Sequence, residues 1–149
     1  MRLHKILTVP DPLLRRPSRP VHRFGRTLDK LIEEMFRVVE AYDGLGLSAV
    51  QIGIPSEVIV VNHPDWRGAM INPYPKKWHG SQFGDEACLS IPGYIGTHIH
   101  RAFLVSVHYH DERGEKRELV AMGPLARVLQ HEMDHLNGIL ITDYAQKAA

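Results

Sequence analysis

The sequence contains one cysteine, no long apolar run and almost no net charge. A single cysteine cannot form an internal disulfide, and nothing else indicates secretion. No segment approaches the ~18 apolar residues that a membrane-spanning helix requires, and residues 1–20 lack the apolar core of a signal peptide. Lys and Arg number 18 against 17 Asp and Glu, which leaves no electrostatic footprint for nucleic acid or an anionic membrane. We expect a cytoplasmic protein without a membrane or nucleic-acid partner.

The composition is that of a soluble globular protein, with 44% hydrophobic and 23% charged residues. A length of 149 residues suggests a single domain over 1–149. At this length roughly 68–70% of the unfolded chain's surface can be buried, so a core forms without disulfides. Ten histidines accompany the one cysteine, and composition leaves Cys88 as a buried hydrophobe, a nucleophile or a metal ligand.

Two stretches have the apolar spacing of amphipathic helices. In residues 26–43, apolar side chains recur at three- and four-residue steps, and Gly44 is placed to end the helix. The second helix, about 124–137, opens on Pro124 and ends before Gly138. Both helices are long enough to pack on a sheet.

Short strands account for most of the remaining order. The predicted strands are 57–62, a weaker one at 69–72, and a hairpin of 102–109 and 115–122 around a turn at 111–114. The stretches without a predicted strand or helix include an extended 1–25, a glycine-punctuated loop at 44–55, a turn-rich 73–84 and a short apolar tail at 139–141. This mixture predicts an α+β fold.

The second helix carries the motif H-E-x-x-H at residues 131–135. His131 and His135 lie one turn apart on one face, at a spacing that lets two imidazoles share one metal ion. Glu132 lies beside them, where a carboxylate can take a proton from metal-bound water. A chance arrangement on a solvated face is the alternative, but the adjoining apolar residues favour a helix packed inside the domain.

Two histidines do not complete a catalytic metal site, which usually has three protein ligands. In the longer motif H-E-x-x-H-x-x-G-x-x-H, Gly138 fits but Ile141 replaces the last histidine. A downstream glutamate is also absent from the sequence, because Asp143 is the one acid after the motif. We therefore expect the third ligand upstream. Cys88 is the strongest candidate because thiolate suits zinc and ferrous iron; a nucleophilic Cys88 with a histidine base is the other catalytic reading.

Three motifs in this order resemble those of the peptide deformylase family. They lie at residues 44–51 (GLGLSAVQ), 86–90 (EACLS) and 130–135 (QHEMDH). The flanking pattern is also similar, so the resemblance covers nearly the whole chain. Ser48 stands where the family usually has alanine, and Ala87 where it usually has glycine, which bears on rate and substrate range more than on metal binding.

The resemblance implies an enzyme that removes the formyl group from the N-terminal formyl-Met of new polypeptides. It implies Cys88, His131 and His135 as metal ligands, Glu132 as the general base, and the Gln51 side chain with the Leu89 N–H as oxyanion donors. The substrate-binding positions that it implies are Leu45, Gly46, Glu86, Leu125 and Val128, with Gly46 and Glu86 pairing to the peptide as an added strand.

One divalent metal ion per chain is expected, with Fe²⁺ as the first expectation and Zn²⁺, Ni²⁺ or Co²⁺ as alternatives. The family also implies nascent formyl-Met polypeptides near the ribosome as partners, and a monomer. It implies short antiparallel sheets around a central helix bearing H-E-x-x-H, a long N-terminal helix and no long C-terminal helix.

Several readings stay open on the sequence alone. A non-catalytic relative, in which Ala87 has cost the activity, would bind metal or formyl-peptide without turnover. Arg101 is a candidate partner for Glu86, with a plain surface arginine as the alternative. His98 with His100, and His108 with His110, alternate as on strands, so exposed polar residues are favoured over a second metal site.

Overall fold

The structure is a computed structural model and describes residues 3–145. Its helices are η1 (Pro12–Arg15), α1 (Arg26–Ala41), η2 (Ala49–Ile52), α2 (Gly123–Leu136) and α3 (Ile141–Ala145). Its strands are β1 (Gly46–Ser48), β2 (Val58–His63), β3 (Trp66–His79), β4 (Gln82–Ala87), β5 (Ile95–Arg101), β6 (Leu104–His110) and β7 (Lys116–Met122). The mixed α/β composition with antiparallel sheets confirms the predicted class.

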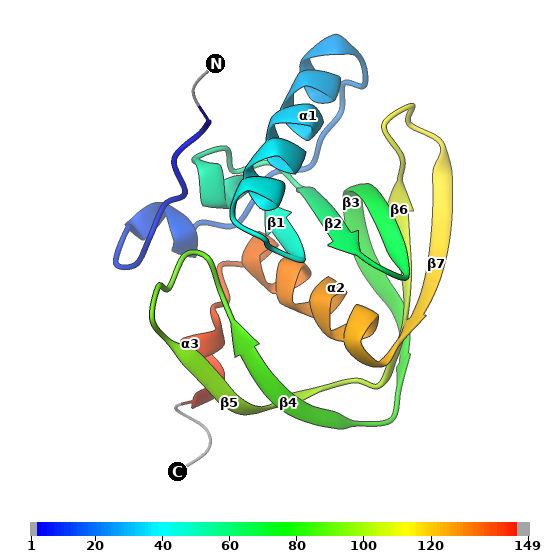
Figure 1. Ribbon diagram of the computed structural model, residues 1–149. Coiled ribbons are helices and arrows are strands. Elements are labelled where there is room, and N and C mark those ends of the chain that lie inside the picture. Colours follow the sequence, from blue (N-terminus) through cyan, green and yellow to red (C-terminus); the bar gives the residue numbers. More distant parts are fainter. Residues whose placement is uncertain (1–2, 146–149) are drawn as a thin grey trace.

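A five-stranded antiparallel sheet in the order β1-β2-β3-β6-β7 forms the main layer, and β4 pairs with β5 in a separate two-stranded sheet. Helix α2 runs through the middle of the molecule between the two sheets, with α1 above it and α3 beside β5 (Figure 1). Both β1 and β4 lie at the edge of their sheets. Each therefore has one side that pairs with no other strand of the described chain.

The apolar run in β2 is continuous because both faces of this strand are buried. Val58 and Val60 pack in the core cluster that contains α1. Ile59 and Val61 pack in the cluster that contains α2. All four side chains are fully buried, so β2 separates two cores and joins the two long helices through one strand.

Helix α2 has one face that packs in the core and another that faces the cavity beside the sheet. Gly123 at φ 58° makes the turn from β7, and Pro124 occupies the first turn, where a missing N–H costs nothing. The core-facing residues recur at four- and three-residue steps: Leu125, Leu129, Met133 and Leu136. His131 and His135 lie on the opposite face of the helix.

The structure corrects the turn-rich prediction for residues 73–84. Strand β3 continues through Pro73 and Pro75 to His79, and β4 begins at Gln82. Prolines are tolerated because the register of β3 against β6 shifts twice, between Ile71 and Tyr74 and between Pro75 and Lys77. Such bulges accommodate residues that cannot donate to the ladder.

Other short elements were also missed. The predicted loop 44–55 contains β1 and η2, residues 95–101 form β5, and the apolar tail runs into α3. These elements are short and stabilised by tertiary contacts rather than by local periodicity, which is why the sequence pattern did not indicate them. Helix α3 ends at Ala145, and the expected absence of a longer C-terminal helix concerns residues 146–149, outside the described residues.

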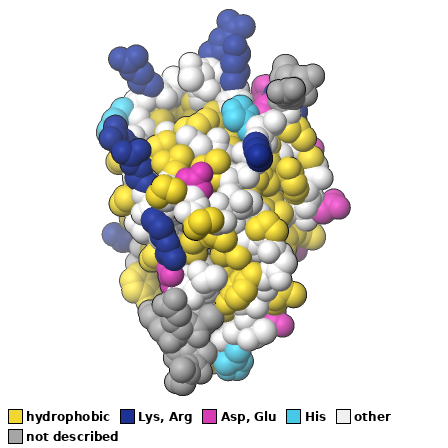
Figure 2. Space-filling model, turned by 90° about the vertical axis from the view of Figure 1, so that its left-hand side faces the viewer, with side chains coloured by type: hydrophobic (Ala, Val, Ile, Leu, Met, Phe, Trp, Pro, Cys, Tyr) yellow, Lys and Arg dark blue, Asp and Glu magenta, His cyan; other side chains and the backbone are white. Residues whose placement is uncertain are grey.

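None of the helices within residues 3–145 has the length and apolar character needed to cross a bilayer. On the face that Figure 2 shows, hydrophobic side chains fill much of the middle, and basic side chains lie mainly along the upper and left parts with acidic ones scattered among them.

Gly138, just after α2, is expected to tolerate no side chain. Its φ is 71°, and a Cβ would lie 2.4 Å from the backbone oxygen of Arg15. Left-handed strain costs about 1–3 kcal/mol, and overpacking against backbone adds about 1–3 kcal/mol. Gly138→Ala should therefore lower the free energy of unfolding in urea by about 2–6 kcal/mol.

Gly53 offers the matched control for that substitution. Its φ is 89°, but nothing lies within 4 Å of an added Cβ. Gly53→Ala should show the backbone strain alone. Equal losses at the two positions would contradict a role for the close approach to Arg15.

Candidate active site

A cavity of about 690 Å³ opens between the unpaired edges of β1 and β4 and is floored by α2. Gly46 of β1, Glu86 of β4 and His131 of α2 all line it. Its volume lies in the usual range for ligand pockets, about 300–1,000 Å³. Exposed hydrophobic side chains form its rim: Tyr42, Leu45 and Ile95.

Cys88, His131 and His135 form a group that could hold a metal ion. One ligand atom from each lies within 4.8 Å of the others, and all three residues are buried. The Cys88 Sγ lies 3.4 Å from His135 Nε2. A thiolate with two imidazoles suits Zn²⁺ or Fe²⁺, so the donor set fits the expected cofactor. It is the one such group found among residues 3–145.

The two histidines have opposite electrostatic surroundings. Burial lowers the pKa of His135 to about 3, aided by the positive charges of His131 and Arg101, so this imidazole is neutral. For His131, burial acts in the same direction, but hydrogen bonding to Cys88 and Glu86 outweighs it and raises the pKa to about 10. A neutral ligand at His131 therefore requires a cation to displace its proton.

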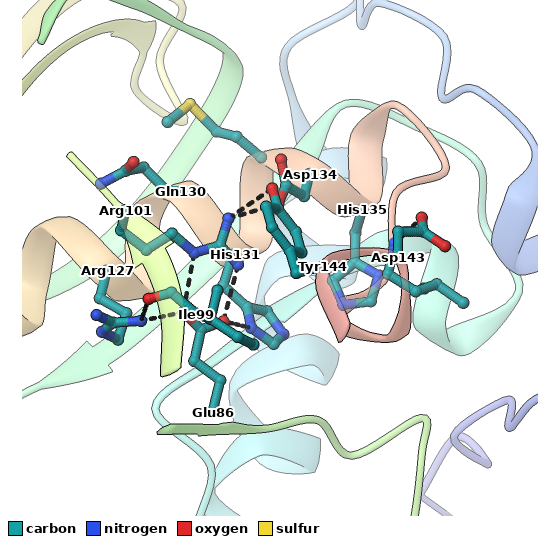
Figure 3. Close-up of polar contacts among 12 residues, drawn as sticks. Glu86, Ile99, Arg101, Arg127, Gln130, His131, Asp134, His135, Asp143 and Tyr144 are labelled. Carbon is teal, nitrogen blue, oxygen red and sulfur yellow. Dashed lines mark hydrogen bonds and ion pairs between the residues drawn. The ribbon is translucent and has the colours of Figure 1, made fainter. Parts of the chain in front are cut away.

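The carboxylate of Glu86 holds His131 from behind. His131 Nδ1 lies 2.8 Å from Glu86 Oε1, which assigns the Nδ1 proton and leaves Nε2 as the metal-ligating atom. Two arginines hold Glu86: Arg101 donates Nε and Nη2 at 2.8 and 2.7 Å, and Arg127 donates Nη1 at 2.6 Å (Figure 3). Although burial raises the pKa of Glu86, the hydrogen bonds from Arg101 and His131 outweigh it and hold that pKa well below its usual range.

Glu132 is buried next to β1. The Ser48 Oγ lies 2.9 Å from the Glu132 carbonyl oxygen and 3.1 Å from its Oε1. A Cβ on Gly46 would lie 2.8 Å from Glu132 Oε2, so the glycine lets the strand pass directly over the carboxylate. Burial raises the pKa of Glu132, which brings a carboxylate closer to the pH range in which a general base works best.

Gln51 and Leu89 reach the same site from different elements. Gln51, on η2, is buried, and its Oε1 accepts from the Ser48 N–H at 2.9 Å. Its Nε2 donates to Ser90 Oγ at 3.0 Å and lies 3.8 Å from Cys88 Sγ. Leu89 directly follows Cys88 and lines the cavity. Both therefore lie where donors could face a group bound beside Cys88.

The structure brings together ten of the eleven predicted site residues. The cavity lining or the donor group includes Leu45, Gly46, Gln51, Glu86, Cys88, Leu89, Val128, His131, Glu132 and His135. Leu125 differs: it packs in the core cluster with Leu129 and is not among the described lining residues. Position 125 lies on the core face of α2, so its place in the substrate pocket stays a prediction that this cavity lining does not support.

The sequence did not predict the contacts that three further residues make at the site. Ser48 contacts Glu132, Arg127 clamps Glu86, and Tyr144 contacts Arg101. Arg127 lies four residues before His131 on the same helix, a spacing that could have indicated a shared face. The open question about Arg101 is settled, because it forms the buried ion pair with Glu86.

The remaining histidine pairs lie elsewhere. His98 and His100 are exposed on β5 and both stack on Phe83, with ring centroids 4.5 and 5.0 Å away. His108 pairs with Glu118 on β7 at 2.6 Å. These contacts account for His98, His100 and His108, whereas the ring of His110 packs against Phe24 at a centroid distance of 5.9 Å.

Gly46→Ala is expected to displace the carboxylate of Glu132. Glu132 is buried and held at Ser48, so it cannot swing away freely. Overpacking costs about 1–3 kcal/mol, and turnover should fall roughly 10- to 100-fold if the loss falls on the barrier. Steady-state kinetics with metal analysis checks this; wild-type turnover would show that the strand has room to shift.

A set of three donors for one cation, next to a buried carboxylate, defines the class of metal-dependent hydrolases. The comparisons with known proteins narrow this class. The chain belongs to the polypeptide deformylase family, whose model matches residues 3–149.

The similarity to three relatives covers almost the whole of this chain. The peptide deformylase of Syntrophomonas wolfei is 41% identical over 97% of this chain and 95% of its own. The crystal structure of peptide deformylase from Thermotoga maritima superposes with a TM-score of 0.93 at 38% identity, covering 97% of this chain and 98% of that one. The enzyme from Synechococcus elongatus, solved in complex with actinonin, gives a TM-score of 0.90 at 38% identity over 94% and 77% of the two chains.

Proposed function

We infer that this chain is a metal-dependent hydrolase that removes the N-formyl group from the N-terminal formyl-methionine of newly made polypeptides and releases formate. The observation that carries this inference is the buried group of Cys88, His131 and His135 beside Glu132, in a chain of the polypeptide deformylase family. Residues 1–149 would form one catalytic domain.

We propose that Cys88, His131 and His135 hold one divalent cation, with Fe²⁺ expected first and Zn²⁺, Ni²⁺ or Co²⁺ as alternatives. When bound, the cation supplies Lewis-acid chemistry that lowers the pKa of coordinated water into the neutral range. Glu86 keeps the proton of His131 on Nδ1, and His135 is neutral. His131 would therefore offer Nε2 once the cation displaces its second proton, and the His135 Nε2, which lies 3.4 Å from Cys88 Sγ, would be the other imidazole ligand atom.

Glu132 would act as the general base and acid. Its carboxylate takes the proton of the attacking water and later delivers it to the departing amine nitrogen. Its burial beneath Gly46 keeps bulk water away from this transfer. Burial raises the pKa of Glu132, which makes its carboxylate a better acceptor for the proton of water in the first step.

The oxygen of the tetrahedral intermediate would be stabilised by two donors of this chain. Gln51 Nε2 lies near Cys88 Sγ, and the Leu89 N–H follows that cysteine. Removing one such donor typically costs ~2.7–4 kcal/mol of the barrier.

The unpaired edges of β1 and β4 would bind the substrate backbone as an added strand. Gly46 and Glu86 lie on these edges at the cavity, and Leu45 and Val128 with His131 offer an apolar lining for the methionine side chain. Ala87, exposed on β4, would influence the fit of the peptide. The proposed setting is the cytoplasm, near the ribosome, with the enzyme as a monomer.

Formate release from a formyl-Met dipeptide tests the function directly. The protein is purified anaerobically, analysed for metal and then reconstituted with Fe²⁺, Ni²⁺, Co²⁺ or Zn²⁺. Turnover by at least one form is expected. Metal binding without formate release in any form would favour the non-catalytic relative in which Ala87 has cost the activity.

A further inference from the structure

The hydroxyl of Tyr144, on α3, joins a polar network that reaches the candidate metal site. It donates to Asp134 Oδ2 at 2.5 Å and accepts from Arg101 Nη1 at 3.0 Å. The same Nη1 donates to Asp134 Oδ2 at 2.6 Å. The Arg101 side chain is only 3% exposed, so these contacts replace water for one side of its guanidinium group.

The other side of Arg101 faces the active site. Its Nε and Nη2 form the two parallel hydrogen bonds to Glu86, and Glu86 Oε1 contacts His131 Nδ1 (Figure 3). A guanidinium group is planar, so its orientation at one edge fixes the direction of its donors at the other. Movement at Tyr144 would therefore tilt the Arg101–Glu86 pair and, with it, the ring of His131.

We propose that Tyr144 is a positioning residue for the metal site. Through Asp134 and Arg101, its hydroxyl holds Glu86 against His131, so that His131 Nε2 points toward Cys88 and His135. The short helix α3 thus contributes to metal retention although it does not line the site cavity in the described structure. The inference rests on the proposed metal site, and it does not depend on which substrate is hydrolysed.

The network has enough redundancy for the hydroxyl to be removed without unfolding the site. Arg127 also holds Glu86 and donates to the Ile99 carbonyl at 3.1 Å. The ring of Tyr144 lies against Arg101, with its centroid 4.7 Å from the guanidinium carbon. Tyr144→Phe keeps that ring contact and removes the hydroxyl hydrogen bonds to Asp134 and Arg101.

The test is the rate at which Co²⁺ or Zn²⁺ is lost to a chelator from the folded, metal-loaded protein. Replacement of groups behind metal ligands typically costs 10–100-fold in metal affinity, and Tyr144→Phe should release metal about tenfold faster. Tyr74→Phe, at an exposed tyrosine on β3, is the matched control and should match the wild type. The proposal would be overturned if Tyr144→Phe released metal at the wild-type rate. If the metal-free variant also unfolded at a lower midpoint than the metal-free wild type, Tyr144 would only anchor α3.

A double-mutant cycle tests the route through Glu86. Glu86→Gln should itself speed metal release, and adding Tyr144→Phe to it should have little further effect, because the neutral amide no longer forms the two-oxygen ion pair with Arg101 through which Tyr144 acts. Full additivity of the two changes would overturn the proposed route. The absorption spectrum of the Co²⁺ form should shift in Tyr144→Phe and stay unchanged in Tyr74→Phe.

These measurements use no formyl peptide. A wild-type protein that retains metal but releases no formate would overturn the proposed function, whereas the Tyr144 inference would be decided by metal release alone.

Discussion

Chelation abolishes formate release, and an added divalent metal restores it: this is the largest effect that we expect. In the proposed mechanism the reaction depends on a cation that Cys88, His131 and His135 would hold, and the ligand atoms of these residues lie within 4.8 Å of one another. Without the cation, nothing in the site lowers the pKa of water into the neutral range. Turnover should fall to the uncatalysed rate after exhaustive chelation and return with metal content.

This experiment also separates the metal mechanism from a nucleophilic Cys88. A thiolate nucleophile with a histidine base would keep its activity in a strong chelator. The variant Cys88→Ser is a second test of the metal mechanism, and we expect it to lose both bound metal and turnover. Activity that persists after metal analysis shows an empty protein would rule out the metal mechanism.

Metal uptake should be linked to pH. Hydrogen bonding to Cys88 and Glu86 outweighs burial and raises the pKa of His131 to about 10 without metal, so binding at pH 7 must release its proton. Apparent affinity should therefore rise as the pH increases toward 10 and fall as the pH decreases. His135, whose burial lowers its pKa to about 3, contributes no such dependence in the neutral range.

Glu132→Gln is expected to reduce turnover about 10²- to 10⁴-fold while metal remains bound. The amide has nearly the same shape and keeps the contact to Ser48, but it cannot accept the proton of water. Since Glu132 is not a member of the donor group, metal content should be unchanged. Steady-state kinetics and metal analysis on one preparation give both results.

Glu118→Gln provides a control of identical chemistry. Glu118 is exposed on β7, contacts His108, and is not among the described residues that line the candidate site. This variant should keep wild-type turnover. If Glu132→Gln also kept wild-type turnover, the general base would have to be another group.

The sequence predicted the parts of the molecule that depend on local periodicity. The apolar spacing of residues 26–43 and 124–137 predicted α1 and α2, and the run at 57–62 predicted β2. H-E-x-x-H placed His131 and His135 on one face because helical geometry alone fixes that relation. The resemblance then brought Cys88, Gln51 and Glu132 to one site, and the structure places them together.

The sequence could not predict features that depend on tertiary contact. Arg101, Asp134 and Tyr144 come from β5, α2 and α3, and no spacing rule relates them. Strand β3 passes through Pro73 and Pro75 only because its register shifts against β6. Leu125 has the hydrophobicity of a pocket residue, and only the rotation of α2 decides that it faces the core.

The unpaired edges of β1 and β4 have a consequence for how variation can act on this enzyme. Recognition along such edges uses amide and carbonyl groups, which every residue except proline carries in the same form. A point substitution in the protein, other than one to proline, leaves these groups in place, and the identity of residues far along the nascent chain does not alter them. One catalyst would therefore accept thousands of different polypeptides, and selectivity would be confined to the first side chain and to the rim of the cavity.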